Sequence, residues 1–231
     1  MLLRLINRLL KVLSLKITFL EKGETIYSRL YDKFQPFTMV RKTAFFTNLE
    51  ISKTIQDIQG DIVECGVWKG GMIASLAQLH GNDRNYWLFD SFEGLPQAKD
   101  IDGVKAKKWQ SDVDSEYYYD NCTADIKDAE MAMTLADCKN YHLVKGWFNK
   151  GLFDKKSPNE IALLRLDGDW YDSTMICLKS LFPKVVKNGI VIIDDYYSWE
   201  GCSKAVHDYL SKCKSTFTIH SRKGVAYIIK K

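Results

Sequence analysis

Residues 161–196 read IALLRLDGDWYDSTMICLKSLFPKVVKNGIVIIDDY. The two ends of this stretch, 161–167 and 188–196, are apolar runs that close on aspartates, which predicts two buried strands. Apolar residues recur at helical spacing between them, so residues 172–187 are predicted to form a crossover helix. Two buried strands joined by a helix form the βαβ unit of a parallel sheet that is covered on both faces.

The same alternation continues on both sides of this unit. Further strands are predicted at 61–67, 85–92 and 141–148, with helices at 43–58, 71–80 and about 201–213. The chain ends in TFTIHS and GVAYIIKK, two short runs joined through Lys223 and Gly224, which predicts an antiparallel hairpin. We therefore expect an α/β fold with a mostly parallel, seven-stranded sheet and a C-terminal antiparallel hairpin.

Composition sets the size and class of the protein. The 231 residues suit one α/β domain, which we place at 41–231, after an N-terminal segment at 1–40. The net charge of +4, from 33 basic and 29 acidic residues, is too small to indicate a nucleic-acid partner. The six cysteines have neither disulfide-framework nor zinc-ligand spacing, which is typical of reduced thiols in a cytoplasmic protein.

The N-terminal twenty residues, MLLRLINRLLKVLSLKITFL, predict an amphipathic basic helix. Arg4, Arg8 and Lys11 lie on one polar stripe and interrupt the apolar run, which argues against a signal peptide or a membrane span. Two interpretations remain open. Residues 1–20 either make peripheral contact with an anionic membrane surface, such as the inner membrane, or pack on the protein itself or a second copy.

Residues 97–140 interrupt the alternation of strands and helices. The segment is polar and aromatic, with Trp109 and a run of three tyrosines at 117–119. An insertion after the carboxyl end of a strand lies beside the crevice where such folds bind ligands. A lid or substrate loop and a decorative surface loop are both consistent with this position.

Two motifs near the first strands suggest a cofactor. Glu64 and Gly66 end the first predicted strand, and this acidic residue and glycine before a helix suit a cationic ligand such as S-adenosylmethionine. A strand–helix turn with no ligand explains that segment equally well. Asp90 ends the second predicted strand, where a carboxylate can accept hydrogen bonds from both ribose hydroxyls of an adenosine cofactor. NAD-binding folds share this device, but the glycine fingerprint of a dinucleotide site is absent.

Four acidic residues follow the last two parallel strands of the predicted sheet. Asp167 and Asp169 end one strand, and Asp194 and Asp195 end the next. Neighbouring strands lie about 4.8 Å apart, so these carboxylates should converge at one edge of the sheet. Such crowding of anions is costly without a cation, and oxygen ligands favour Mg²⁺, with Mn²⁺ or Ca²⁺ as alternatives. The competing interpretation, helix caps and a solvated turn, explains single residues but not the cluster.

Several longer motifs carry a resemblance to a known family. These are VECGVWKGG (63–71), LFDSFEGLP (88–96), VKGWF (144–148), LLRLDGDWYDST (163–174), LFPKVVKNGIVIIDDY (181–196) and GCSKAV (201–206). In sequence and order they resemble the macrocin O-methyltransferase (TylF/MycF-type) family of Rossmann-like class I methyltransferases, over about residues 40–210.

The resemblance implies a metal-dependent O-methyltransferase that uses S-adenosylmethionine and acts on a sugar hydroxyl. The acceptor would be a surface glycan, a nucleotide-sugar or a glycosylated natural product, and the enzyme a homo-oligomer. Asp167, Asp194 and Asp195 would bind the metal, and Asp169 would be the general base. The cofactor motifs cover six residues: Glu64, Gly66, Trp68, Gly70, Asp90 and Ser91.

Two alternatives share most of these features. A catechol- or phenol-type metal-dependent methyltransferase would carry the same aspartate arrangement. A non-catalytic nucleotide-binding protein on the same fold would be expected to lose part of the acidic cluster, whereas all of it is present here.

Overall fold

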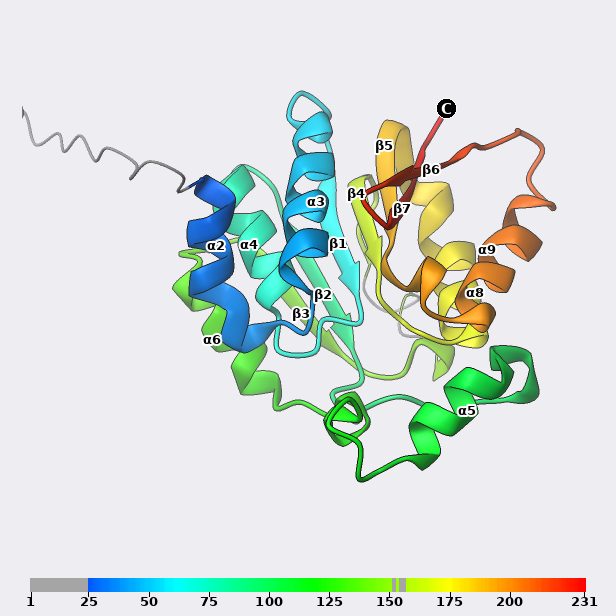
Figure 1. Ribbon diagram of the computed structural model, residues 1–231. Coiled ribbons are helices and arrows are strands. Elements are labelled where there is room, and N and C mark those ends of the chain that lie inside the picture. Colours follow the sequence, from blue (N-terminus) through cyan, green and yellow to red (C-terminus); the bar gives the residue numbers. More distant parts are fainter. Residues whose placement is uncertain (1–24, 151–152, 154–156) are drawn as a thin grey trace, which may run out of the picture.

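The computed structural model describes residues 25–150, 153 and 157–231 of the chain. Its centre is a seven-stranded sheet with the order β3-β2-β1-β4-β5-β7-β6 (Figure 1). The strands are β1 (Asp61–Cys65), β2 (Tyr86–Asp90), β3 (Tyr141–Lys145), β4 (Ile161–Leu166), β5 (Val185–Ile193), β6 (Ile219–Arg222) and β7 (Val225–Ile229). The first five are parallel, and β7 runs antiparallel between β5 and β6. The predicted fold class is confirmed.

Helices cover both faces of this sheet (Figure 1). On one face lie α2 (Ile26–Phe34), α3 (Lys42–Ser52), α4 (Gly71–His80) and α6 (Ile126–Leu135), and on the other α8 (Tyr171–Leu181) and α9 (Glu200–Leu210). A further helix, α5 (Gly103–Ser111), lies beyond the carboxyl ends of the strands. Successive strand residues alternate between two hydrophobic cores, as Ile62 and Val63 do in β1, because strand side chains point to opposite faces.

The element boundaries differ from the predicted ones by a few residues. The crossover helix α8 ends at Leu181 rather than 187, because Pro183 follows in a short 3-10 turn. The next strand, β5, begins at Val185 rather than 188, and its pairing with β4 shifts register between Ile161 and Leu163. The predicted helix at 43–58 is split into α3 and a 3-10 turn at Lys53–Ile55.

The segment at 97–140 consists of two different parts. Its second part contains α6, whose Ala129, Ala132 and Met133 are buried in the core, so α6 is the regular crossover between β2 and β3. Only the first part, with α5 and the tyrosine run, projects past the sheet. The sequence pattern did not predict α6, because the segment is mostly polar and the buried face of this helix consists largely of alanine.

Residues 25–40 pack on the main domain rather than apart from it. Leu30 and Phe34 of α2 are fully buried beside Phe45 and Leu49 of α3. The predicted amphipathic helix at 1–20, with its proposed membrane contact, lies outside the described residues. None of the described helices is long and hydrophobic enough to cross a bilayer.

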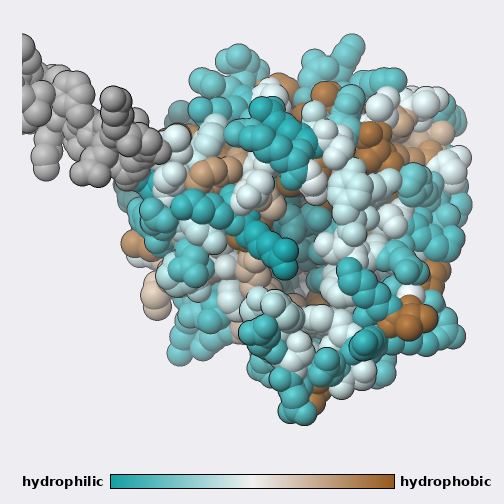
Figure 2. All heavy atoms as spheres, viewed as in Figure 1, coloured by the Kyte–Doolittle hydropathy of each residue, from teal (hydrophilic) through white to brown (hydrophobic). Residues whose placement is uncertain are grey.

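The surface in Figure 2 is mostly polar, and the thiols are unpaired. The face in Figure 2 carries mainly hydrophilic and neutral side chains, with hydrophobic residues in small separate groups. All six cysteines are free, and four of them are buried, where cysteine packs as a small hydrophobe.

The register of the central strands determines which residues meet at their carboxyl ends. Leu166 pairs with Cys65 on one side and with Ile193 on the other. The next residues along these three strands, Gly66, Asp167 and Asp194, therefore lie side by side. Gly66 has a φ of +85°, and a Cβ atom there would lie 1.7 Å from the carbonyl oxygen of Asp167. Only glycine allows β1 to turn this close to β4.

We expect Gly66→Ala to destabilise the fold more than Gly224→Ala. Gly224 has a similar φ of +82°, but the Cβ that alanine would add there has no atom within 4 Å, so this substitution tests the backbone strain alone, at about 1–2 kcal/mol. Overpacking against the Asp167 carbonyl should add about 2 kcal/mol at Gly66. Urea unfolding followed by circular dichroism measures both. Equal losses in the two variants would contradict the close approach of β1 and β4.

Candidate active site

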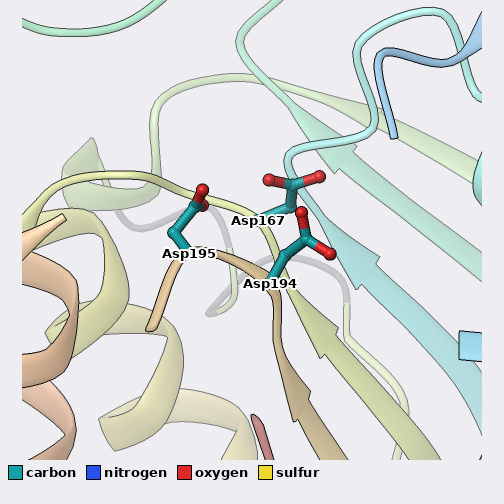
Figure 3. A group of neighbouring side chains, drawn as sticks. All are labelled: Asp167, Asp194 and Asp195. Atoms are coloured by element: carbon teal, nitrogen blue, oxygen red, sulfur yellow. The ribbon is translucent and has the colours of Figure 1, made fainter. Parts of the chain in front are cut away.

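Three aspartates converge at the carboxyl ends of β4 and β5. One carboxylate oxygen from each of Asp167, Asp194 and Asp195 lies within 4.8 Å of the others, and the three side chains point toward one another (Figure 3). Asp167 directly follows β4, while Asp194 and Asp195 begin the 3-10 turn that follows β5. The structure thus brings together the three predicted metal-ligating residues.

A buried arginine lies among these acids. Arg165 of β4 is fully buried, and its guanidinium contacts Glu64 Oε1, Asp167 Oδ2 at 2.7 Å and Asp194 Oδ1 at 2.5 Å. Its Nε donates to Asn48 Oδ1 of α3 at 3.1 Å. The strand register causes this arrangement, because Arg165 pairs with Glu64 and with Ile192, two residues before Asp194.

Sequence reasoning missed Arg165, although the sequence contains a signal for it. The residue lies inside the apolar run IALLRL, where an unpaired guanidinium would cost several kcal/mol. Its presence there indicates carboxylate partners on the adjacent strands. The cost of crowding the acids is therefore partly offset within the protein, without any bound ion.

Arg165 does not balance the whole cluster. Five carboxylates, Glu64, Asp167, Asp169, Asp194 and Asp195, line the same cavity as this one guanidinium. Burial raises the pKa of Asp194 to about 6, with Arg165 opposing the shift. Burial also raises the pKa of Asp195, and the Asp169 charge adds to that shift. The site thus gathers more carboxyl groups than Arg165 can pair with, and oxygen donors of this kind suit a hard divalent cation.

Asp169 lies beside this cluster in a constrained conformation. Its φ of +54° is in the left-handed region, and its backbone N–H donates to Asp195 Oδ2 at 3.1 Å. Its Oδ1 accepts a hydrogen bond from the indole Nε1 of Trp199 at 2.8 Å. Burial, reinforced by the Asp167 charge, raises the pKa of Asp169 to about 8.

A first cavity runs along the carboxyl ends of β1 and β2. Of the residues in the predicted cofactor motifs, Gly66, Trp68, Asp90 and Ser91 line it. Asp90 accepts hydrogen bonds from the backbone N–H groups of Trp68 at 2.8 Å and of Phe92 at 2.7 Å. A carboxylate oxygen has more than one acceptor position, so Asp90 can also accept from ligand hydroxyls.

The other two residues of those motifs lie elsewhere. Glu64 is 1% exposed and bound to Arg165, on the side of a second cavity. Gly70 precedes α4 with a φ of +79°, and a Cβ there would lie 3.0 Å from the Ala129 Cα. This geometry gives Gly70 a packing role between α4 and α6.

The second cavity has aromatic walls and an acidic floor. Its aromatic residues come from the β1–α4 loop, the insertion and the residue before α9: Trp68, Trp109, Tyr117, Tyr119 and Trp199. The two cavities share five lining residues: Met39, Trp68, Cys122, Asp167 and Asp169. Two ligands, one in each cavity, would therefore meet beside Asp167 and Asp169.

Solved structures of methyltransferases share this fold. The O-methyltransferase NovP superimposes with a TM-score of 0.69 at 26% sequence identity, covering 84% of this chain and 82% of NovP. The calicheamicin methyltransferase CalS11 superimposes with a TM-score of 0.60 at 19% identity, covering 92% of this chain and 99% of CalS11. The second likeness concerns the fold alone.

Sequence comparison identifies the family. The demethyldecarbamoylnovobiocin O-methyltransferase of Streptomyces niveus is 33% identical over 68% of this chain, and a tetracenomycin rhamnosyl 4'-O-methyltransferase of Streptomyces olivaceus is 34% identical over 66%. These matches span 60% and 58% of the relatives' own lengths. The model of the macrocin-O-methyltransferase (TylF) family matches residues 35–226. The chain therefore belongs to the macrocin-O-methyltransferase (TylF) family.

Proposed function

We propose that this chain transfers the methyl group of S-adenosylmethionine to a hydroxyl of a sugar, with a divalent cation held by Asp167, Asp194 and Asp195. One observation carries the proposal: Asp167 and Asp169 line both cavities. A methyl donor in the first cavity and an acceptor in the second would react where the two meet. Family membership supports the methyl donor, and the name of the Streptomyces olivaceus relative supports a glycoside acceptor.

The residues divide the work of binding between the two cavities. Asp90, at the carboxyl end of β2, is placed to accept hydrogen bonds from the ribose hydroxyls of the cofactor. The aromatic walls of the second cavity, among them Trp109 and Tyr119, offer flat surfaces to the apolar face of a sugar ring. Holding both reactants in line accounts for much of the rate enhancement in such transfers.

Asp169 is the base in this proposal. The methyl carbon leaves the sulfonium sulfur and bonds to the acceptor oxygen, S-adenosylhomocysteine is released, and the hydroxyl proton passes to the Asp169 carboxylate. A divalent cation at the three aspartates would supply positive charge that stabilises the acceptor oxygen as it loses its proton. Burial, together with the Asp167 charge, raises the pKa of Asp169 above the usual aspartate value, which favours proton uptake by this carboxylate.

An acceptor screen tests the function. Purified full-length protein, S-adenosylmethionine and Mg²⁺ would be incubated with methyl α-L-rhamnopyranoside, an aryl rhamnoside, dTDP-L-rhamnose and catechol, and products analysed by mass spectrometry. Methylation of a sugar hydroxyl supports the proposal. Methylation of catechol alone would assign the chain to the phenol type, and no transfer to any acceptor would argue against the proposed reaction.

Removing the metal should abolish activity. Protein dialysed against EDTA should lose methyl transfer and regain it with added Mg²⁺ or Mn²⁺. The reason is that, in this proposal, a cation held by the carboxylate cluster stabilises the acceptor oxygen. Mn²⁺ binding, followed by electron paramagnetic resonance, should be lost in Asp195→Ala. It should be retained in the control Asp128→Ala, because Asp128 lies on α6 and pairs with Lys69. Full activity after chelation would rule out a metal in the reaction.

Replacing the base should reduce turnover without reducing cofactor binding. Asp169→Asn keeps the shape and the tolerance for positive φ but cannot accept the proton, so we expect kcat to fall by about 10²- to 10³-fold. The dissociation constant for S-adenosylhomocysteine, measured by calorimetry, should stay within about twofold. Asp208→Asn, which alters a surface carboxylate on α9, is the control. Retention of wild-type kcat in Asp169→Asn would refute the assignment.

A further inference from the structure

The carboxylate of Asp169 accepts a hydrogen bond from the indole of Trp199. Trp199 immediately precedes α9, and its Nε1 donates to Asp169 Oδ1 at 2.8 Å. The backbone N–H of Trp199 donates to the carbonyl oxygen of Asp195 at 3.0 Å. The turn that carries Asp194 and Asp195 thus also places the indole beside Asp169.

The backbone conformation of Asp169 is fixed, so only its side-chain torsions remain free to vary. The φ of +54° and the hydrogen bond from its N–H to Asp195 fix where the Cα–Cβ bond points. A left-handed conformation at a non-glycine residue costs about 1 kcal/mol and often marks a functional position. The side-chain torsions still have to be held, and a hydrogen bond to one carboxylate oxygen does so.

Helix α5 of the insertion packs against Trp199. The Trp199 ring packs edge-on against Trp109 of α5, with ring centroids 5.9 Å apart, and against Trp170 at 5.2 Å. Lys105, also on α5, places its Nζ 5.0 Å from the Trp199 ring centroid and donates to the Ser198 carbonyl at 2.9 Å. Two residues of α5 therefore support the loop and the indole.

The insertion is itself anchored to the sheet domain. Asp102, which is 2% exposed, accepts from the backbone N–H of Tyr171 at 2.7 Å, at the first turn of α8. The Trp109 Nε1 donates to the Tyr117 carbonyl at 2.8 Å, which ties α5 to the tyrosine run. A continuous set of contacts thus joins the first turn of α8, α5, Trp199 and Asp169.

We propose that Trp199 is the positioning residue for Asp169. Its indole N–H orients the carboxylate toward the junction of the two cavities, and α5 holds the indole in place. The inference rests on the proposed function, because it assigns Trp199 a role through the base of that reaction. The competing possibility is that Trp199 serves only as an aromatic wall of the second cavity.

A matched pair of substitutions separates these roles. Trp199→Phe keeps a ring in the cluster but removes the donor. Trp87→Phe removes an equivalent bond, from the Trp87 indole to Asp61 Oδ2 at 2.8 Å, at the opposite end of the sheet. For Trp199→Phe we expect kcat to fall by about tenfold or more, since a hydrogen bond to a charged group is lost. KM for the acceptor and the dissociation constant of S-adenosylhomocysteine should change by less than about twofold, and Trp87→Phe should match wild type.

A double-mutant cycle tests whether Trp199 acts through Asp169. In the Asp169→Asn background, Trp199→Phe should cause no further fall in kcat, because the partner that it positions no longer acts as a base. Additive losses would overturn the inference. A raised KM for the acceptor with unchanged kcat would also overturn it and would assign Trp199 to the cavity wall.

An arm without any acceptor keeps the test independent of the proposed function. In ¹⁵N-tryptophan-labelled protein, Asp169→Asn should shift the indole N–H resonance of Trp199 and leave that of Trp87 in place, while Asp61→Asn should do the reverse. A Trp199 resonance unmoved by Asp169→Asn would overturn the inference even if Trp199→Phe failed to fold. If wild type methylates nothing in the screen, the proposed function fails, and this spectrum alone decides whether Trp199 holds Asp169.

Discussion

The buried guanidinium of Arg165 is the constraint on which the arrangement of the site depends. It joins Glu64 of β1, Asp167 after β4 and Asp194 after β5, so one cation links the ends of three adjacent strands. A buried charge is tolerated only when it is paired and hydrogen-bonded, and removing one partner leaves the others uncompensated. The carboxylates are consequently held close together by the protein itself. An ion that binds there meets ligands already in position.

The same interaction separates two groups of acids. Glu64 is fully buried and pairs with Arg165, so its charge serves the internal ion pair. The ion pairs of Arg165 within the described part of the chain go to Glu64, Asp167 and Asp194, and do not extend to Asp195 or Asp169. Burial raises the pKa values of both Asp195 and Asp169, and neighbouring carboxylates raise them further. A cation in the cluster would pair with these carboxylates, which Arg165 does not contact.

Much of the fold and the acidic cluster could be predicted from the sequence because both depend on local patterns. Apolar runs that end in aspartate predict strands, and parallel strands present their carboxyl ends at one edge, so the convergence of Asp167 with Asp194 follows from topology. The place of Arg165 in an apolar run indicates that it has carboxylate partners, but strand register selects which acids these are, and a single sequence does not reveal the register. Composition likewise could not separate α6 from the insertion, since a helix whose buried face consists of alanine has the composition of an exposed helix.

The insertion shows how a segment outside the regular alternation of strands and helices can bear on the chemistry. The insertion adds no strand to the sheet, and its helix α5 adds little to the hydrophobic core. Asp102 nevertheless accepts a hydrogen bond from the first turn of α8, and Trp109 packs on Trp199. The same Trp109 lines the second cavity, so one side chain contacts both this cavity and Trp199, whose indole donates to Asp169. If the second cavity takes the acceptor, as we propose, an insertion that changes to fit a different acceptor has to preserve an aromatic contact at position 109, because that contact supports the indole that donates to Asp169.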